Sequence, residues 1–317
     1  MEGYTRAMNE QKAKAIASWK GSGEKEVASF YKEFLQSSPP TIFEGYGTTQ
    51  GKGRVLAILK DQEPVDSASS GDEIEFLTDK TPFYGESGGQ VGDSGRAFNE
   101  IIQLELNDAN KPLPGLIVHK AKIIQGNLHT GDNLTLEVNR QTRGDTALNH
   151  TATHLLHAAL KEVLGEHIKQ AGSLVASNRL RFDYTHFSPL TDKERIRIES
   201  RVNEKVRENI QVSTQEMDID SAIKEGAMAL FGEKYGETVR VVNIPGFSKE
   251  LCGGTHITAT GDIGLFRITS EGGIASGVRR IEAVTGATAY DTIRAEQESL
   301  SAIRGLLKAP SNEEIAK

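Results

Sequence analysis

The spacing of apolar residues changes along the chain, and each spacing predicts a different kind of structure. Residues 3–19 and 24–35 carry apolar side chains at helical intervals, so the sequence predicts two amphipathic helices separated by Gly21 and Gly23. From residue 41 to residue 140, short runs of β-forming residues are bounded by Gly, Pro, Asn and Asp. This pattern predicts a small antiparallel barrel or sandwich. Its strands are expected at residues 54–59, 73–77, 101–106, 116–124 and 133–138.

Helical and extended patterns alternate irregularly from residue 141 to residue 286, which predicts helices packed on an antiparallel sheet. In the helix that carries His150 and His154, Asp145 or Thr146 is expected to cap the start and Gly165 the end. A capping box that begins at Thr191 opens another helix, whose apolar face is formed by Ile198, Val202, Val206 and Ile210. Strands are expected at residues 168–175, 180–184, 211–217, 238–244, 264–269 and 277–284, with a short helix at 221–225.

A last helix is expected from residue 287 to residue 307. Its apolar residues follow a heptad-like spacing, at Ile293, Leu300, Ile303 and Leu307. No other segment of the sequence has a pattern that would cover this apolar face of the helix. We therefore expect one of two partners for it: the second helix of a coiled hairpin, which this sequence does not contain, or another subunit, through self-association. The amphipathic helix at the very start of the chain adds to the expectation that the sequence is a piece of something longer.

The predicted fold class is α+β. We expect a helical segment at residues 1–38, a glycine-rich β-barrel at 39–140, a mixed α+β domain at 141–286 and the start of a coiled helix at 287–317.

Composition describes an ordinary soluble protein with room for two cores. The chain has 317 residues, of which 37% are hydrophobic and 26% charged. It lacks an apolar signal segment and any run of 18 apolar residues, so secretion and membrane spanning are not expected. One cysteine excludes an internal disulfide and fits the reducing cytoplasm. The net charge of −7 argues against a generic nucleic-acid coat.

Two short segments carry the candidate chemistry. The string NHTATHLLH at residues 149–157 places His150 and His154 one helical turn apart, and Cys252 lies four residues before His256. Two imidazoles from a helix, with a thiolate and an imidazole from a loop, form a ligand set that suits zinc better than magnesium or calcium. His157 shares the helix face, so spacing alone lets any two of the three histidines pair. We expect His157 to support the ligands or to pack, and ordinary core histidines are the alternative for all three.

The densest group of glycines lies at residues 85–95. It is not a phosphate-binding Walker A loop, because no Lys-Ser or Lys-Thr follows the glycines, and the segment around Lys52 fails the same test. We favour tight turns or bulges with positive φ over ligand contact as the reason for these glycines.

Six strings carry a resemblance to a known family: SGGQVGDSG, NHTATHLLHAAL, GAMALFGEKYG, LCGGTH, GDIGLFRI and GVRRIEAVTG. They resemble the editing region of alanyl-tRNA synthetases, and the similarity runs over essentially the whole chain. The metal signature alone is also found in free-standing editing proteins and in the threonyl-tRNA synthetase editing domain, whereas the glycine-rich segment and the last string favour the alanyl branch.

The resemblance implies an aminoacyl-tRNA deacylase that hydrolyses tRNA(Ala) mischarged with serine or glycine. His150, His154, Cys252 and His256 match the family's metal-binding pattern, so Zn²⁺ is the implied cofactor and the mixed domain is the implied editing domain. Gln170 matches a pocket residue implicated in editing. The ATP-dependent aminoacylation domain lies upstream in the family, so aminoacylation is not expected of this chain.

The chemistry of such a site leaves several choices open. The substrate is an ester, and a bound zinc can hold the α-amino group or activate water, with either three or four protein ligands. Gln170 and Cys252 are the predicted catalytic residues. The Gln170 amide is not a base at neutral pH, but it can hydrogen-bond a serine hydroxyl or orient water, with filling a strand face as the alternative.

Arg279 and Arg280 are candidate tRNA-binding residues. They alternate on a predicted strand, so only one can face a cleft or a phosphate, and a solvated or salt-bridged face is the alternative for both. Two other functions remain open at this stage: a structural zinc module and a tRNA-binding module without hydrolytic activity.

Overall fold

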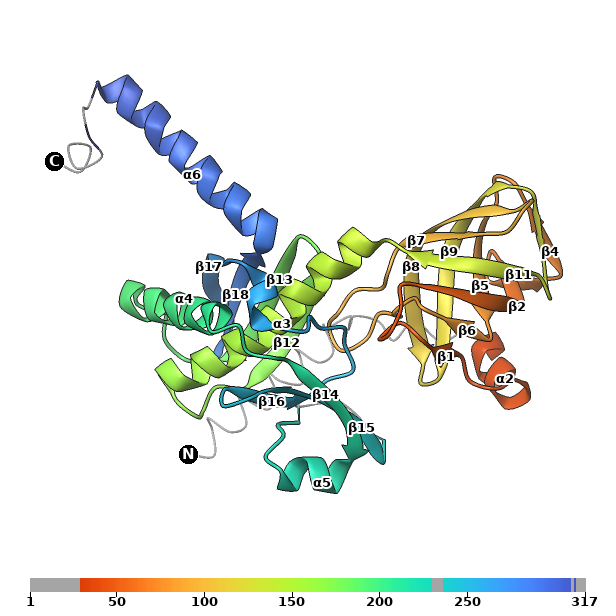
Figure 1. Ribbon diagram of the computed structural model, residues 1–317, viewed down its shortest axis with the longest axis horizontal. Coiled ribbons are helices and arrows are strands. Elements are labelled where there is room, and N and C mark those ends of the chain that lie inside the picture. Colours follow the sequence, from red (N-terminus) through yellow and green to blue (C-terminus); the bar gives the residue numbers. More distant parts are fainter. Residues whose placement is uncertain (1–28, 230–235, 309–310, 312–317) are drawn as a thin grey trace, which may run out of the picture.

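The computed structural model describes residues 29–229, 236–308 and 311. Two units lie side by side, a β-barrel and a mixed unit of helices and sheets, and helix α6 (Gly286–Leu307) projects away from both (Figure 1). The predicted helix at residues 3–19 lies outside the described residues. Within them, no helix combines the length and the apolar character needed to cross a membrane.

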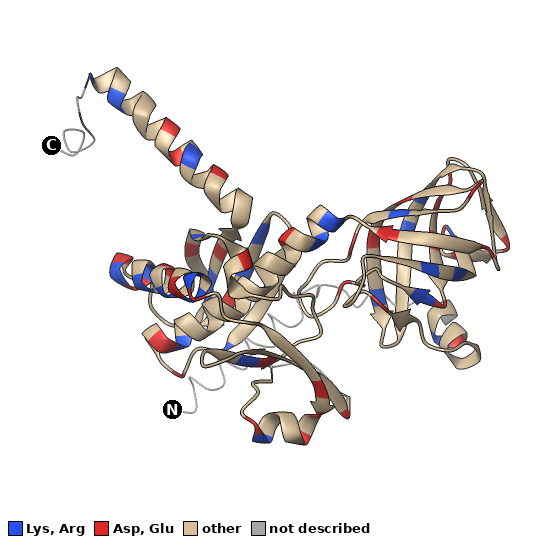
Figure 2. Cartoon of the chain, in the orientation of Figure 1, with Lys and Arg blue, Asp and Glu red and all other residues tan. Residues whose placement is uncertain are grey.

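Charged residues of both signs are interspersed over the helices and the barrel in Figure 2, in keeping with the moderate net charge of −7. Many of them are paired. On helix α4 (Asp192–Arg207), for example, Arg201 contacts Glu204 at 2.9 Å and Glu162 of the neighbouring helix at the same distance. Such surface pairs contribute little to stability.

The barrel is a closed antiparallel sheet, as predicted. Its strands follow the order β11-β7-β8-β9-β5-β2, and β11 pairs back to β2 to close the ring. The strands are β2 (Gln50–Lys60), β5 (Glu73–Thr78), β7 (Gly95–Phe98), β8 (Gln103–Leu113), β9 (Leu116–Gln125) and β11 (Asn133–Val138). Closure removes the exposed strand edges that favour aggregation.

Short elements complete the barrel. They are β1 (Ile42–Phe43) paired with β6 (Lys80–Thr81), β3 (Glu63–Val65) on β2, and β4 (Ser67–Ser69) paired with β10 (Asn127–His129). Helix α2 (Ser29–Ser37) packs on the outside, where Tyr31 is buried against Leu59 and Leu116.

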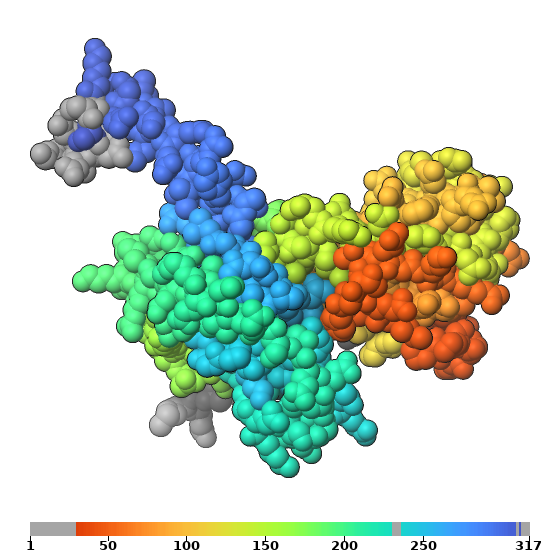
Figure 3. Space-filling model, in the orientation of Figure 1, coloured from red at the N-terminus to blue at the C-terminus, as the bar shows by residue number. Residues whose placement is uncertain are grey.

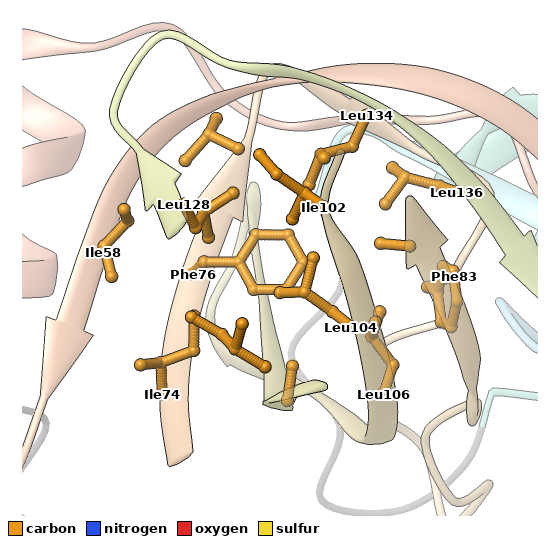
Figure 4. Packing of buried hydrophobic residues seen from close by; sticks show 14 of the residues in the cluster. Ile58, Ile74, Phe76, Phe83, Ile102, Leu104, Leu106, Leu128, Leu134 and Leu136 are labelled. Carbon is orange, nitrogen blue, oxygen red and sulfur yellow. The ribbon is translucent and has the colours of Figure 1, made fainter. Parts of the chain in front are cut away.

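Alternating side chains fill the barrel interior. Phe76 lies at the centre of the packed residues, with Ile58, Leu104 and Leu134 around it (Figure 4). Each of these side chains is at most 2% exposed, and full burial of one such side chain contributes roughly 1.5–3 kcal/mol. The barrel therefore has a core of its own.

The mixed unit packs two helices on a four-stranded sheet. Helix α3 (Arg140–Leu164) and helix α4 cover the sheet β12-β13-β18-β17. Its strands are β12 (Gln170–Ala176), β13 (Arg179–Thr185), β17 (Phe266–Ala275) and β18 (Val278–Thr285). The predicted apolar positions Ile198, Val202 and Val206 are buried in the core between them. The mixed fold class is thus confirmed.

A second, three-stranded sheet carries one side of the candidate site. It consists of β14 (Ser213–Asp218), β15 (Thr238–Ile244) and β16 (Ser248–Leu251), with helix α5 (Ile219–Lys224) packed on it and a short 3₁₀ helix (Thr260–Ile263) further along the chain. Strand β16 leads directly into the Cys252–His256 segment, and the sequence pattern had not indicated this strand.

The start of α3 differs from the prediction. The helix begins at Arg140, and its N-cap is Asn139, whose side chain accepts from the Thr142 amide. Asp145 and Thr146 lie inside the helix, so the prediction that one of them caps it is wrong. The first turn lacks an apolar face, but Arg143 on it forms a buried ion pair with Asp93 of the barrel unit, which explains why it is helical. The end at Gly165 and the capping box at Thr191 are confirmed.

The glycine-rich segment joins the two units. The Val175 amide donates to the Gly89 carbonyl at 2.7 Å, and the Val91 amide donates to the Val175 carbonyl at 3.0 Å. Gly89 has a φ of +81°, and a Cβ there would lie 2.9 Å from the Ser173 carbonyl oxygen. The expected tight geometry is therefore present, and it allows close approach of two backbones. In the space-filling view the orange-red part of the barrel unit lies against the blue part of the mixed unit (Figure 3).

Helix α6 matches the predicted 287–307 closely. Its first turn is anchored by buried Ala289, and further along Leu300, Ile303, Leu306 and Leu307 are exposed. No described residue covers this apolar seam, and self-association through it stays a prediction.

Candidate metal centre

Four side chains from two distant segments converge at one point. Helix α3 supplies His150 and His154, and the segment after β16 supplies Cys252 and His256. Their ligand atoms all lie within 4.8 Å of one another. The Cys252 Sγ lies 3.4 Å from His150 Nε2 and 3.3 Å from His256 Nε2. The structure thus brings together the four residues that the sequence singled out.

Each histidine of the cluster is held from behind through its Nδ1 atom. Gln90 Oε1 lies 2.8 Å from His150 Nδ1, and Glu250 Oε2 lies 3.0 Å from His154 Nδ1. Thr151 Oγ1 lies 3.1 Å from His256 Nδ1. These contacts orient the rings so that every Nε2 atom faces the interior of the cluster. Outer hydrogen bonds of this kind set the tautomer and the basicity of metal-binding histidines.

One atom of the cluster has no protein partner. His154 Nε2 is buried and makes no hydrogen bond within the described part of the chain, whereas the other ring nitrogen is bound to Glu250. A buried polar atom without a partner costs roughly 1–3 kcal/mol. A metal ion held between the four ligand atoms supplies the partner that this nitrogen lacks, so the residues fit such a group.

The surroundings favour the ionised form of Cys252. Burial alone raises the pKa of the thiol, but the adjacent His150 and His256 and the hydrogen bonds from the rings hold that pKa well below its usual range. Burial, reinforced by the neighbouring His150, lowers the pKa of His256 to about 3. A thiolate and a neutral imidazole are the states in which Cys and His bind metals.

Glu250 is a site residue that the sequence reasoning missed. Burial lowers the pKa of His154, but the carboxylate of Glu250 outweighs it and raises that pKa to about 10. The same carboxylate lies 3.2 Å from His157 Nδ1 and accepts from Ser248 Oγ at 3.0 Å. It favours positive charge on His154, whether a proton or a metal ion supplies it. His157 thus contacts the carboxylate that holds His154, and either a supporting or a packing role fits this position.

The lack of a side chain at Gly254 lets the Cys252–His256 segment lie close to α3. A Cβ on Gly254 would lie 2.0 Å from His150 Cε1, so no side chain fits at that position. Arg240 holds the same segment by donating from Nη1 to the Cys252 carbonyl at 3.0 Å and to the Gly254 carbonyl at 2.8 Å. Tyr46 of the barrel unit donates its hydroxyl hydrogen to the Gly253 carbonyl.

A pocket of about 410 Å³ opens beside the cluster, between the two units. Its wall is formed by residues 45–49 of the barrel unit and by Arg143, Ala147, Arg240, Thr255 and His256. His256 is only half-buried, whereas the other three cluster residues are buried. The cluster is therefore approached from the His256 side.

Gln90 is the second residue that sequence reasoning missed. Its side chain is fully buried, accepts from the Thr255 amide at 2.9 Å and donates from Nε2 to Thr255 Oγ1 at 3.0 Å. Gln90 lies in the glycine-rich segment, which we expected to serve shape alone. The segment does serve shape, and it also delivers a polar side chain to His150.

Gln170 begins strand β12, where its Nε2 atom donates to Ser173 Oγ at 3.2 Å. Its side chain is half-buried, it makes no hydrogen bond to the four cluster residues and it does not line the pocket. Its catalytic role stays a prediction.

Arg279 and Arg280 are both paired with carboxylates. Arg279 binds Glu271 through two contacts, one of them 2.9 Å from Nη2 to Oε2. Arg280 contacts Asp183 at 2.7 and 2.9 Å. The salt-bridged alternative therefore describes both side chains, and tRNA binding by either stays a prediction.

Comparison with known proteins covers both units. Residues 1–142 match the family model of class II (A) tRNA synthetases, and residues 239–282 match the second additional domain of threonyl and alanyl tRNA synthetases. The second match contains Arg240, Glu250, Cys252 and His256. Over its whole length the chain is 49% identical to alanine–tRNA ligases from Xanthomonas campestris pv. campestris, Xanthomonas axonopodis pv. citri and Xanthomonas oryzae pv. oryzae.

The chain belongs to the alanyl-tRNA synthetase family. It spans 36% of the length of these curated alanyl-tRNA synthetases. The resemblance found in the sequence is therefore confirmed. The match to the second additional domain lies on the segment that carries Cys252 and His256, and α3 brings the other two ligand candidates to it.

Proposed function

We propose that this chain removes serine or glycine from mischarged tRNA(Ala) by hydrolysing the aminoacyl ester at a zinc site. The observation that carries the proposal is the convergence of His150, His154, Cys252 and His256 at the wall of a pocket. Membership of a tRNA synthetase family supports tRNA as the partner. A cytoplasmic location follows from that partner and belongs to the same proposal.

Zinc fits the donor set and its spacing. Bond lengths of about 2.3 Å to sulfur and about 2.0–2.1 Å to nitrogen give tetrahedral sulfur-to-nitrogen distances of roughly 3.5–3.6 Å. The distances from Cys252 Sγ to the Nε2 atoms of His150 and His256, 3.4 and 3.3 Å, are slightly shorter than this value. A thiolate and three imidazoles are ligands that zinc prefers over the hard cations magnesium and calcium.

When bound, zinc supplies Lewis-acid polarisation of an ester carbonyl or of a water molecule. The chain's own residues decide where the ester lies. His256 and Thr255 form the inner wall of the pocket, and the Thr255 hydroxyl is held by Gln90. An ester that enters the pocket therefore meets the ligand cluster at its half-buried His256 edge. Access from this edge is compatible with two ways of binding. Water or substrate could join the metal as a fifth ligand, or it could replace one of the four side chains.

A second, hydrolytic site answers a selectivity problem. An aminoacylation pocket shaped for alanine excludes large side chains. It discriminates against an analogue that adds only a hydroxyl by only about 10²-fold in kcat/KM. The hydrolytic site must spare alanine, which requires polar groups that reward the serine hydroxyl. Gln170 is our candidate for that contact, through its amide, on the strength of the family resemblance alone, because its side chain does not line the pocket.

The decisive experiment measures release of serine from Ser-tRNA(Ala) by the wild type and by Cys252→Ala, with Ala-tRNA(Ala) as the substrate that must be spared. We expect release by the wild type, about one zinc per chain by metal analysis, and loss of both in the variant. Circular dichroism checks that the variant folds. A folded Cys252→Ala that releases serine at the wild-type rate would overturn the proposal.

A structural zinc module is the second candidate, because His150, His154 and Cys252 are all at most 9% exposed. A closed site of this kind contributes to folding rather than to catalysis. It predicts that chelation unfolds the mixed unit and that the zinc-loaded chain leaves Ser-tRNA(Ala) intact. The half-buried position of His256 beside the pocket favours the hydrolytic site over this alternative.

A further inference from the structure

We propose that residues 45–49 of the barrel unit, together with Arg140 and Arg240, form the subsite that binds the 3′-terminal nucleotide of the acylated RNA. This inference rests on the proposed function, and it assigns to the barrel a direct part in substrate binding.

The position of the pocket sets where the nucleotide must lie. Thr255 and His256 form one part of the pocket wall, and Tyr46, Thr48 and Thr49 form another. In an aminoacyl RNA the ester joins the amino acid to the terminal ribose. When the ester lies at His256, the attached nucleoside can extend only along the remaining wall. That wall consists of the loop that precedes β2 and of Arg143, Ala147 and Arg240.

Charge distinguishes the arginines around the pocket. Arg143 is neutralised by Asp93, and its other guanidinium contacts are to the Gly45 carbonyl at 2.8 Å and the Pro82 carbonyl at 2.9 Å. The charge of Arg143 is thus balanced by a buried carboxylate of the protein itself. Arg143 therefore holds the pocket wall rather than a ligand.

Arg140 and Arg240 are different, because neither has a carboxylate within 4.0 Å in the described parts of the chain. Arg140 Nε donates to Thr49 Oγ1 at 3.1 Å, and Arg240 Nη1 donates only to backbone carbonyls. Two arginines without an ion-pair partner among the described residues thus flank one loop on a protein whose net charge is −7, although Glu216 lies opposite Arg240 on the neighbouring strand β14. Phosphate groups of a nucleic-acid strand are the ligands that such a pair positions.

Tyr46 adds an aromatic ring beside Arg240, and this ring also packs edge-to-face with Phe43. The Arg240 guanidinium carbon lies 4.1 Å from the centre of the Tyr46 ring, and the hydroxyl of Tyr46 is tied to the Gly253 carbonyl. The side chain nevertheless remains 48% exposed. Unpaired RNA bases stack on aromatic rings and on guanidinium planes held in this way. An exposed base platform next to phosphate-binding charges fits a nucleotide better than a free amino acid.

The test uses the whole chain and two unacylated RNA hairpins, one with a single-stranded CCA 3′ end and one that lacks the terminal adenosine. Fluorescence anisotropy measures their affinities, so hydrolysis is not required. We expect the wild type to bind the complete end about tenfold more tightly, in line with the contribution of one stacked base. Tyr46→Ala should abolish this difference, and Tyr46→Phe, which keeps the ring, should retain most of it.

Arg140→Gln tests the charge. Loss of one phosphate contact should lower the slope of log affinity against log salt concentration by about 0.7. The matched control is Arg96→Gln, because Arg96 is an exposed barrel arginine already paired with Glu137 at 2.8 Å. Zinc content measured on every variant shows that the ligand cluster is intact.

Equal binding of the two hairpins by the wild type, or an undiminished preference in Tyr46→Ala, would overturn the subsite. A preference for the terminal adenosine that Tyr46→Ala loses would support it even if Ser-tRNA(Ala) stayed intact, in which case the hydrolytic proposal alone would fall. The two proposals are therefore separable.

Discussion

Gln90 Oε1 lies 2.8 Å from His150 Nδ1, so a barrel-unit side chain sets the orientation of a ligand on helix α3. The two residues are 60 positions apart in sequence. The same oxygen accepts from the Thr255 amide at 2.9 Å, and Thr255 lies in the Cys252–His256 segment that carries the other two ligand candidates. One buried amide therefore connects the glycine-rich segment, α3 and the Cys252–His256 segment.

Replacing Gln90 by Ala should weaken zinc binding by about 10–100-fold, the usual effect of removing the partner of a metal-binding histidine. Competition with a chelator measures the affinity. Gln103→Ala is the control, because Gln103 is an exposed glutamine on barrel strand β8 and should leave zinc affinity unchanged. Equal affinities for the two variants would show that the Gln90 contact does not support the site.

The two neighbouring glycines after Cys252 offer a matched pair. A Cβ on Gly254 would lie 2.0 Å from His150 Cε1, whereas the nearest atom to a Cβ on Gly253 is Tyr46 Oη at 3.9 Å. Gly254→Ala should therefore displace a ligand ring and abolish stoichiometric zinc binding, and Gly253→Ala should retain it. Metal analysis after gel filtration measures both. Full zinc content in Gly254→Ala would contradict the close packing of the segment on α3.

Glu250 is buried with two histidines against it, His154 at 3.0 Å and His157 at 3.2 Å. Glu250→Gln keeps the shape but removes the charge that stabilises a cation on His154. We expect zinc affinity to fall about 10–100-fold. Breaking one side of a buried charged network also costs roughly 3 kcal/mol of unfolding free energy, which urea titration measures.

The control for that variant is Glu225→Gln. Glu225 pairs with Lys249 at 2.7 Å on the surface of the same unit, and its side chain is 56% exposed. Exposed pairs contribute about 0–1 kcal/mol, so this variant should differ little from the wild type in either measurement. A Glu250→Gln protein as stable and as metal-rich as Glu225→Gln would show that the carboxylate is dispensable.

The ligand cluster could be predicted from the sequence because its two halves are local. Helical spacing alone places His150 beside His154, and the short interval from Cys252 to His256 fits one loop. Gln90 and Glu250 could not be predicted in the same way. Their contacts depend on how the barrel docks on α3 and on strand β16, which is only four residues long and precedes two glycines.

The predicted boundaries of helices and strands were wrong where tertiary contacts outweigh the local conformational preference of the sequence. The first turn of α3 is polar, and the buried pair of Arg143 with Asp93 holds it in place. Strand β17 was expected to end at residue 269 but continues to Ala275 through Gly272 and Gly273. It does so because the hairpin with β18 accommodates bulges between Ile268 and Ser270 and between Gly273 and Ala275. Gly272 and Gly273 lie in this continuation, next to the second bulge.

His119 makes the barrel sensitive to acid. It is fully buried, stacks on Phe76 with ring centres 4.8 Å apart, and its Nε2 atom lies 2.8 Å from Thr81 Oγ1. Burial lowers the pKa of His119 to about 4, and the hydrogen bond to the Phe76 carbonyl offsets this only in part. Between its ordinary pKa of about 6.5 and this value, the unfolded chain binds a proton that the folded chain does not.

The unfolding free energy must therefore fall as the pH falls through this window. Above the window the contribution of His119 to stability is fully present. We expect this group alone to remove about 2 kcal/mol of unfolding free energy between pH 7 and pH 5. Urea titrations at both pH values measure the loss for the wild type and for His119→Phe, which has no proton to gain at this position. The variant should start less stable, because Thr81 loses a hydrogen-bond partner, but its loss between the two pH values should be smaller by that amount. The same pH-dependent loss in both proteins would mean that His119 is protonated in the folded barrel at pH 5.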